Sequence, residues 1–230
     1  MSEFDYIKRN YESLLCEIED ISARVGVKAP TLVSVTKSGT DEELLHLAAA
    51  GAVDIGENRP GEVKRRGELL CAAGYAPRMH EIGTLQRNKI KYIIDSVHLI
   101  HSVDSVKLGT DIDRLAEKAG RRVPVLIEVN SAREENKSGV MPEAAEALMC
   151  ELSEFKNIEL VGLMTMGPVC DNAEDIRPYF RATRKLFERL RDSYGFGKEP
   201  IMSMGMSDSY RVAIEEGSTL VRVGRRLFLK

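Results

Sequence analysis

Apolar residues near the start of the chain recur at the spacing of a helix that packs one face on a core. The series is Phe4, Ile7, Tyr11, Leu14, Leu15, Ile18 and Ile21. Gly26 follows as a stop signal, so the pattern predicts a leading helix within residues 1–26. Residues 31–36 (TLVSVT) are apolar and β-branched, which predicts a strand. Thr40 and Glu43 then have capping-box spacing and open a second helix.

This strand–helix unit repeats to the end of the chain. We predict further strands over residues 53–56, 79–82, 97–101, 124–129, 160–165, 201–204 and 220–223, with a helix between consecutive strands. Eight such units with parallel crossovers close a (β/α)8 barrel of the TIM type, an α/β fold. An open doubly wound sheet is the alternative, because several strand patterns are weak. Only residues 224–230 follow the last strand, so we expect the leading helix to take the place of an eighth outer helix.

Composition narrows the class of protein. The 230 residues are 43% hydrophobic and 30% charged, and no linker divides them, so residues 1–230 are expected to form a single domain. The net charge of −3 is spread along the chain, which argues against a nucleic-acid partner. Residues 1–25 mix charges unlike a signal peptide, and no apolar run has the length of a membrane span. We therefore expect a cytoplasmic protein with no membrane partner, and a monomer, since no large exposed apolar face is evident.

Cysteines and histidines give no sign of a metal site. The four cysteines are widely spaced, as inert thiols are in a reducing compartment. His98 and His101 are three apart in a predicted strand, so we expect their side chains on opposite faces and no metal between them. His80, on the third strand, is either a base or a hydrogen-bonded core histidine, and the second interpretation is favoured.

Lys37 ends the first strand just before a helix start. It has the same parity as Val33 and Val35, which places its amine at the carboxyl-end rim of a barrel lumen, where barrel active sites lie. A lysine partly withdrawn from water has a lowered pKa and can form a Schiff base. A surface lysine with a solvated tip is the alternative.

The loops after the last two strands are of the type that binds phosphate. Ser203 and Gly205 follow the seventh strand and Gly224 follows the eighth, where barrels frequently hold a phosphate group. Arg222 alternates with its apolar neighbours, so it is expected to face the lumen, where a pyridine nitrogen would serve as its acceptor. Ordinary turn glycines and a paired structural arginine remain alternatives. Amine, phosphate loops and arginine together describe a pyridoxal phosphate site.

Several motifs resemble those of the pyridoxal phosphate homeostasis proteins, single-domain relatives of the alanine racemase barrel (fold type III). They are VSVTK (33–37), GENR (56–59), HEIGTLQRNK (80–89), IEVNSAREENKSG (127–139), GLMTMGP (162–168), SMGMSDSY (203–210) and VRVG (221–224). The resemblance implies a covalent aldimine between pyridoxal 5′-phosphate and Lys37 and a phosphate site in the last two loops. It also implies Asn58 and Met164 near the cofactor, with Lys137 as a secondary contact.

The chain departs from the family pattern at three places. Met79 replaces a tryptophan before His80, Pro60-Gly61 replaces a Val-Gln pair, and Arg225 replaces a threonine of the phosphate loop. Arg225 keeps its backbone N–H, so it stays a candidate phosphate contact.

The resemblance implies a protein of intracellular pyridoxal phosphate (vitamin B6) homeostasis rather than an enzyme. The racemases draw an acid/base tyrosine from a second domain and a partner subunit. Tyr179, Tyr194 and Tyr210 of this chain lie in no comparable context. Apo enzymes that use pyridoxal phosphate are the expected recipients. A racemase-like enzyme and a Schiff-base aldolase acting on a phosphosugar are the alternatives.

Overall fold

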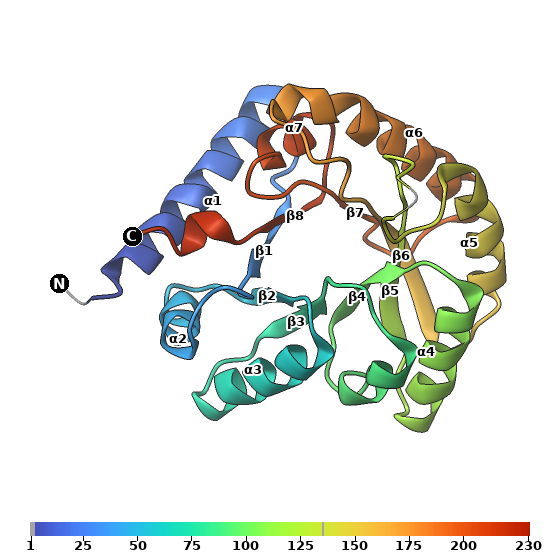
Figure 1. Ribbon diagram of the computed structural model, residues 1–230, viewed down its shortest axis with the longest axis horizontal. Helices are drawn as coiled ribbons and strands as arrows, with labels where there is room; N and C mark the ends of the chain where they lie inside the picture. The colour runs from blue at the N-terminus through green and yellow to red at the C-terminus, as the bar shows by residue number, and fades with distance from the viewer. Residues whose placement is uncertain (1–2, 135) are drawn as a thin grey trace.

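The computed structural model describes residues 3–134 and 136–230, so Met1, Ser2 and Glu135 lie outside this description. Within these residues, eight parallel strands pair in chain order and the first pairs with the last, which closes a barrel (Figure 1). The strands are β1 (Thr31–Val35), β2 (Asp54–Glu57), β3 (Arg78–Glu81), β4 (Leu99–Val103), β5 (Val123–Glu128), β6 (Ile158–Met164), β7 (Ile201–Ser203) and β8 (Leu220–Val223). The predicted barrel is confirmed, and the open sheet is excluded because Val33 pairs with Arg222 across the closure.

Helices surround the barrel. The α-helices are α1 (Asp5–Val25), α2 (Asp41–Ala49), α3 (Pro60–Ala72), α4 (Val106–Lys118), α5 (Ala145–Ser153), α6 (Arg177–Tyr194) and α7 (Tyr210–Glu215). Short 3-10 helices are η1 (Arg87–Tyr92), η2 (Pro142–Ala144), η3 (Ala173–Ile176) and η4 (Arg225–Leu227). The helix expected between the third and fourth strands is the 3-10 helix η1, whose larger rise per residue spans the short connection with fewer residues.

The helix starts follow the capping signals of the sequence. Glu43 N–H donates to Thr40 Oγ1 at 3.1 Å and Thr40 N–H donates to Glu43 Oε2 at 2.6 Å, which is the predicted capping box of α2. Ser105 caps α4 through the N–H of Leu108. No helix in the described part of the chain combines the length and the apolar character needed to cross a membrane.

Helix α1 takes the outer position that follows β8, as predicted. It packs against α2, α7 and η4 and lies along the outside of the ring beside the last residues of the chain (Figure 1). Its Asn10 amide donates to the carbonyl of Leu229 at 2.7 Å, and its Glu17 accepts from Tyr210 Oη at 2.6 Å and from Arg226 at 2.8 Å. The leading helix therefore completes the ring.

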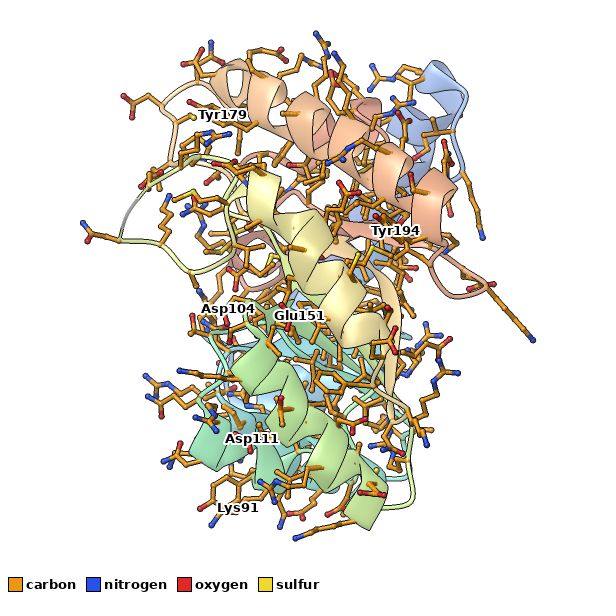
Figure 2. The ribbon with its side chains drawn as sticks, turned by 90° about the vertical axis from the view of Figure 1, so that its right-hand side faces the viewer. Lys91, Asp104, Asp111, Glu151, Tyr179 and Tyr194 are labelled. Carbon is orange, nitrogen blue, oxygen red and sulfur yellow. The ribbon has the colours of Figure 1, made fainter. Side chains whose placement is uncertain are left out.

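The core has two layers. The larger layer fills the space between the strands and the helices. The smaller fills the barrel lumen with Val33, Leu99, Leu126, Val161, Met164 and Leu220. Alternate strand residues thus face inward, as in other barrels. In the side view, α6 runs from Tyr179 to Tyr194, and Asp104, just after β4, lies on the side where α6 begins (Figure 2). That side is the carboxyl-end rim of the strands.

Candidate functional site

Arg222 lies in the lumen, as its alternation with apolar neighbours predicts. Its side chain is 4% exposed and donates to Ser203 Oγ and, at 3.1 Å, to the carbonyl oxygen of Thr165. Burial lowers the pKa of Arg222 to about 10, while the nearby Glu128 carboxylate opposes that shift. The guanidinium is therefore still a cation at neutral pH, and two of its five donors are already used.

A chain of polar side chains crosses the lumen from Arg222. Ser203 Oγ lies 3.1 Å from His101 Nδ1. The other nitrogen of that ring, Nε2, lies 3.0 Å from His80 Nδ1, and His80 Nε2 lies 2.9 Å from Asp54 Oδ1. All five side chains are buried. His80 is thus a hydrogen-bonded core histidine, in agreement with the favoured interpretation.

One order of donors gives every hydrogen bond of this chain one donor and one acceptor. Burial holds the pKa of His101 well below its usual value. Burial alone would raise the pKa of Asp54, but hydrogen bonds from His80 and Arg78 lower it, so this carboxylate accepts. Ser203 then donates to His101, His101 to His80 and His80 to Asp54, while Ser203 accepts from Arg222. The polar chain therefore supports Arg222 as a fixed cation.

The loops after β7 and β8 lie side by side at the rim. Gly224 N–H donates to Ser207 Oγ at 3.4 Å, and the Arg225 side chain pairs with Asp208. Among the described residues, the backbone N–H groups of Ser207, Asp208, Arg225 and Arg226 donate no hydrogen bond. Four unused donors on two adjoining loops suit an oxyanion such as phosphate.

The two glycines of these loops are required for close packing. Gly205 has a φ of +94°, and a Cβ there would lie 2.5 Å from Ala213 Cβ. A Cβ on Gly224 would lie 2.8 Å from the carbonyl oxygen of Val35. Gly205 also presents its carbonyl oxygen, not its N–H, to the backbone of Arg222 at 3.0 Å. Gly205 therefore allows α7 to pack closely against this loop. Ser203, two residues earlier, accepts a hydrogen bond from Arg222.

Lys37 is an exposed residue in the turn after β1. The turn itself is fixed by a buried ion pair that the sequence analysis missed. Arg66 of α3 donates to Glu57 Oε1 at 2.7 Å, to the carbonyl of Gly39 at 2.7 Å and to the carbonyl of Thr36. The backbone on both sides of Lys37 is thus held in place, while its side chain is exposed to solvent.

Asn58 and Met164 occupy different depths of the same end of the barrel. Met164 is buried in the lumen layer, at the end of β6. Asn58 is half-buried just after β2, and its carbonyl oxygen lies so close to Gly83 that a Cβ there would come within 2.2 Å. Both residues therefore lie at the rim, and the structure adds no contact between them.

Glu128 is a rim residue that sequence reasoning did not single out. It ends β5 two positions after the inward-facing Leu126, which is the signal that could have identified it. Burial, followed by the charge of Asp104, raises the pKa of Glu128 to about 7. Ser138 Oγ donates to its Oε1 at 3.3 Å, whereas its buried Oε2 has no partner among the described groups. Lys137, the residue before Ser138, does not bind Glu128. Its Nζ donates to Glu134 Oε1 at 2.7 Å and to the carbonyl oxygen of Gly167 at 3.3 Å.

Residues 10–229 match the family model of the alanine racemase N-terminal domain. A pyridoxal phosphate homeostasis protein of Aquifex aeolicus is 40% identical over 203 residues, which cover 88% of each chain. The chain belongs to the pyridoxal phosphate homeostasis protein family. This family assignment agrees with the resemblance of the seven motifs.

Solved structures extend the comparison. An unknown protein from Bifidobacterium adolescentis has a TM-score of 0.91 and 34% identity, with 99% of this chain and 97% of that chain covered. PipY of Synechococcus elongatus, solved with PLP bound, has a TM-score of 0.84 and 27% identity over 97% of this chain and 100% of that chain. The family fold thus extends over nearly the whole length of this chain.

The donor set at the rim fits the cofactor named for these relatives. A primary amine on an exposed lysine can react with an aldehyde. Four free N–H groups suit a phosphate, and the buried Arg222 cation suits a ring nitrogen that accepts a hydrogen bond. An aldehyde, a phosphate and a ring nitrogen are all present in pyridoxal phosphate.

Proposed function

We propose that this chain binds pyridoxal 5′-phosphate as a Schiff base on Lys37 and serves in the homeostasis of that cofactor without amino-acid chemistry of its own. The observation that carries the proposal is the arrangement of three groups at one rim. These are the exposed Lys37 on a fixed turn, the free N–H groups of the adjoining loops, and the buried cation of Arg222. The relatives named as homeostasis proteins and the PLP-bound PipY support it.

Each rim residue has a role in the proposal. Lys37 supplies the amine for the aldehyde, and the loops that contain Gly205, Gly224 and Arg225 receive the phosphate. Ser203 holds Arg222, which faces the ring nitrogen, while Asn58 and Met164 border the ring. When bound, the cofactor supplies an electrophilic carbon joined to a conjugated ring that can accept electrons. Arg225 contributes backbone N–H only, because its side chain pairs with Asp208.

The nature of the ring contact favours storage over catalysis. Arginine has donors and no acceptor, so Arg222 leaves a pyridine nitrogen unprotonated. An unprotonated ring withdraws electrons less than one held by a carboxylate, so this site would stabilise a substrate carbanion weakly.

The tyrosines also argue against racemase chemistry. Tyr210 is buried against α1 with its hydroxyl bound to Glu17, and Tyr194 binds Glu146 on the outer helices. Tyr179 lies at the start of α6 in the outer ring (Figure 2). A second base on the opposite face of a substrate is therefore not supplied by any of these three residues.

The absorbance of the purified protein tests cofactor binding. We expect a visible band after incubation with pyridoxal phosphate, bleached by borohydride with the cofactor fixed to Lys37 in a peptide digest. Lys37→Ala should lose the band and remain folded, because Lys37 is exposed. Lys91→Ala is the matched control, since Lys91 lies on η1 beside Tyr92 and should leave the band unchanged. A band that survives Lys37→Ala would overturn the covalent assignment.

Two further measurements test the role. Loaded protein should restore activity to an apo enzyme that uses pyridoxal phosphate, at a rate above that of buffer with the same free cofactor. Incubation with chiral amino acids in deuterated water should leave the α-proton in place. Exchange at an enzymatic rate would instead establish a racemase-like enzyme, and a protein that gains no visible band would point to the aldolase alternative.

A further inference from the structure

Three metal-ligating side chains converge near the amino-terminal ends of three neighbouring strands, at the end of the barrel opposite to Lys37. Asp54 is the first residue of β2, His80 lies in β3, and His98 directly precedes β4. These strands are hydrogen-bonded neighbours, with Asp54 opposite Arg78 and His80 opposite Leu99. One ligand atom from each of the three side chains lies within 4.8 Å of the other two. The barrel register, and not proximity in sequence, brings them together.

The donor set is that of a transition-metal site. Two imidazoles and one carboxylate, with a further position open, are the three protein ligands of many zinc centres. Asp54 Oδ1 and His80 Nε2 are 2.9 Å apart, and the His80 and His98 rings meet edge to face with centroids 5.3 Å apart. Zinc-to-nitrogen distances of about 2.0–2.1 Å place ligand atoms about 3.3 Å apart in a tetrahedron. The Asp54–His80 pair therefore needs to open by only a few tenths of an ångström.

The side chains behind the ligands are arranged as in metal centres. A metal-bound imidazole usually has a hydrogen-bond partner on its other nitrogen, which fixes the ring. His80 Nδ1 has that partner in His101 Nε2 at 3.0 Å, and Asp54 Oδ2 accepts from Arg78. With a metal ion on Nε2, His80 would carry its proton on Nδ1 and donate to His101, which reverses the donor order of the polar chain.

The site is open to solvent on one side. Asp54 and His80 are buried, whereas His98 is exposed and provides the entry for an ion and for a water ligand. Arg78 is the competing cation at Asp54, and its side chain, 49% exposed, is free to swing into solvent when an ion binds.

We propose that Asp54, His80 and His98 bind one divalent transition-metal ion of the Zn²⁺ class, at the end of the barrel opposite the cofactor rim. Imidazole ligands favour such ions over Mg²⁺ and Ca²⁺, which prefer oxygen. The proposal does not depend on the proposed function, because none of the three ligands is assigned to the cofactor.

Titration of the chelator-treated protein with Co²⁺, followed by displacement with Zn²⁺, tests the site. We expect one equivalent of Co²⁺, a visible band from a site of low coordination number, and no near-ultraviolet band from thiolate. The thiolate band matters because Cys16, Cys71 and Cys150 are exposed and could bind the ion elsewhere. Excess Mg²⁺ should not displace the ion.

Variants at exposed histidines make the test specific. His98→Ala should weaken Co²⁺ binding at least tenfold, because it removes one of the three ligands. Since the His98 side chain is exposed, the variant is expected to fold, so weaker binding would not result from unfolding. His46→Ala is the matched control, because His46 is also exposed and stacks on Phe4 in the outer layer. Arg78→Ala should bind at least as tightly as the parent. Absence of a stoichiometric Co²⁺ complex, a thiolate spectrum, or equal effects of His98→Ala and His46→Ala would overturn the proposal.

Discussion

The Arg66 guanidinium donates a hydrogen bond to the carbonyl oxygen of Thr36, the residue directly before Lys37. The same side chain binds the carbonyl of Gly39 and the buried carboxylate of Glu57. One helix residue thereby holds both ends of the turn from which the proposed reactive amine extends. The position of Lys37 depends on α3 as well as on its own strand.

Replacing Arg66 should therefore destabilise the protein strongly. Arg66→Met leaves Glu57 as an unpaired buried carboxylate, and burial already raises the pKa of that group. The expected loss is about 3–5 kcal/mol in the free energy of unfolding, measured by urea denaturation. Arg65→Met is the control, because the neighbouring Arg65 pairs with Asp41 and Glu62 at the surface and should cost about 1 kcal/mol or less. Equal losses in the two variants would show that the turn does not need Arg66.

Ser203 should be the most sensitive link of the polar chain. Ser203→Ala leaves donors or acceptors on Arg222 and His101 without a partner, at an expected cost of about 1–3 kcal/mol. Ser102→Ala provides the comparison, because Ser102 Oγ is equally buried on β4 but has no partner within the described structure. That variant should be neutral or slightly stabilising. Urea denaturation measures the free energy of unfolding of both variants. A loss in Ser102→Ala as large as that in Ser203→Ala would contradict the prediction.

Glu81 should make the protein less stable as pH rises. Burial raises the pKa of Glu81 to about 8, above its ordinary value of 4.5, with the nearby charge of Glu57 acting in the same direction. The folded state then holds a proton that the unfolded state has released, so stability falls as pH rises between these two values. Glu81→Gln should remove most of this loss. Unfolding free energies at several pH values across the window check it, and identical slopes for parent and variant would exclude Glu81 as the cause.

Gly205 should tolerate alanine less well than another glycine with positive φ. Gly205→Ala adds both backbone strain and a contact of 2.5 Å with Ala213 Cβ, whereas Gly51→Ala at a φ of +101° meets no atom within 4 Å. We expect about 1–2 kcal/mol for the strain alone at Gly51 and a larger loss at Gly205. Thermal unfolding compares the two directly. The Gly205 variant should also bind pyridoxal phosphate more weakly, since α7 and the loop before it shift together.

The barrel was predictable because its signals are local. Strand periodicity placed all eight strands within a few residues, and the short segment after residue 223 implied that the leading helix completes the ring. The inward direction of Arg222 followed from its alternation with Val221 and Val223. These inferences need only the neighbours of each residue along the chain.

The contacts between strands were not predictable in the same way. The Asp54–His80–His101 series depends on the relative register of three strands, which no single segment encodes. Arg66 did carry a signal, because it shares a helix face with the buried Val63 and Leu70. An arginine on an apolar stripe indicates a buried partner, yet the partner, Glu57, is known only once α3 is placed on β2.

The position of α1 has a consequence for how the chain is made. Its neighbours α7 and η4 lie about two hundred residues further along, so those contacts form only when synthesis of the barrel is nearly finished. Until α7 and η4 are made, they cannot cover the apolar face of α1, which includes Ile7, Leu14 and Ile18. Ring closure is thus a late, long-range event, which favours slow and cooperative folding.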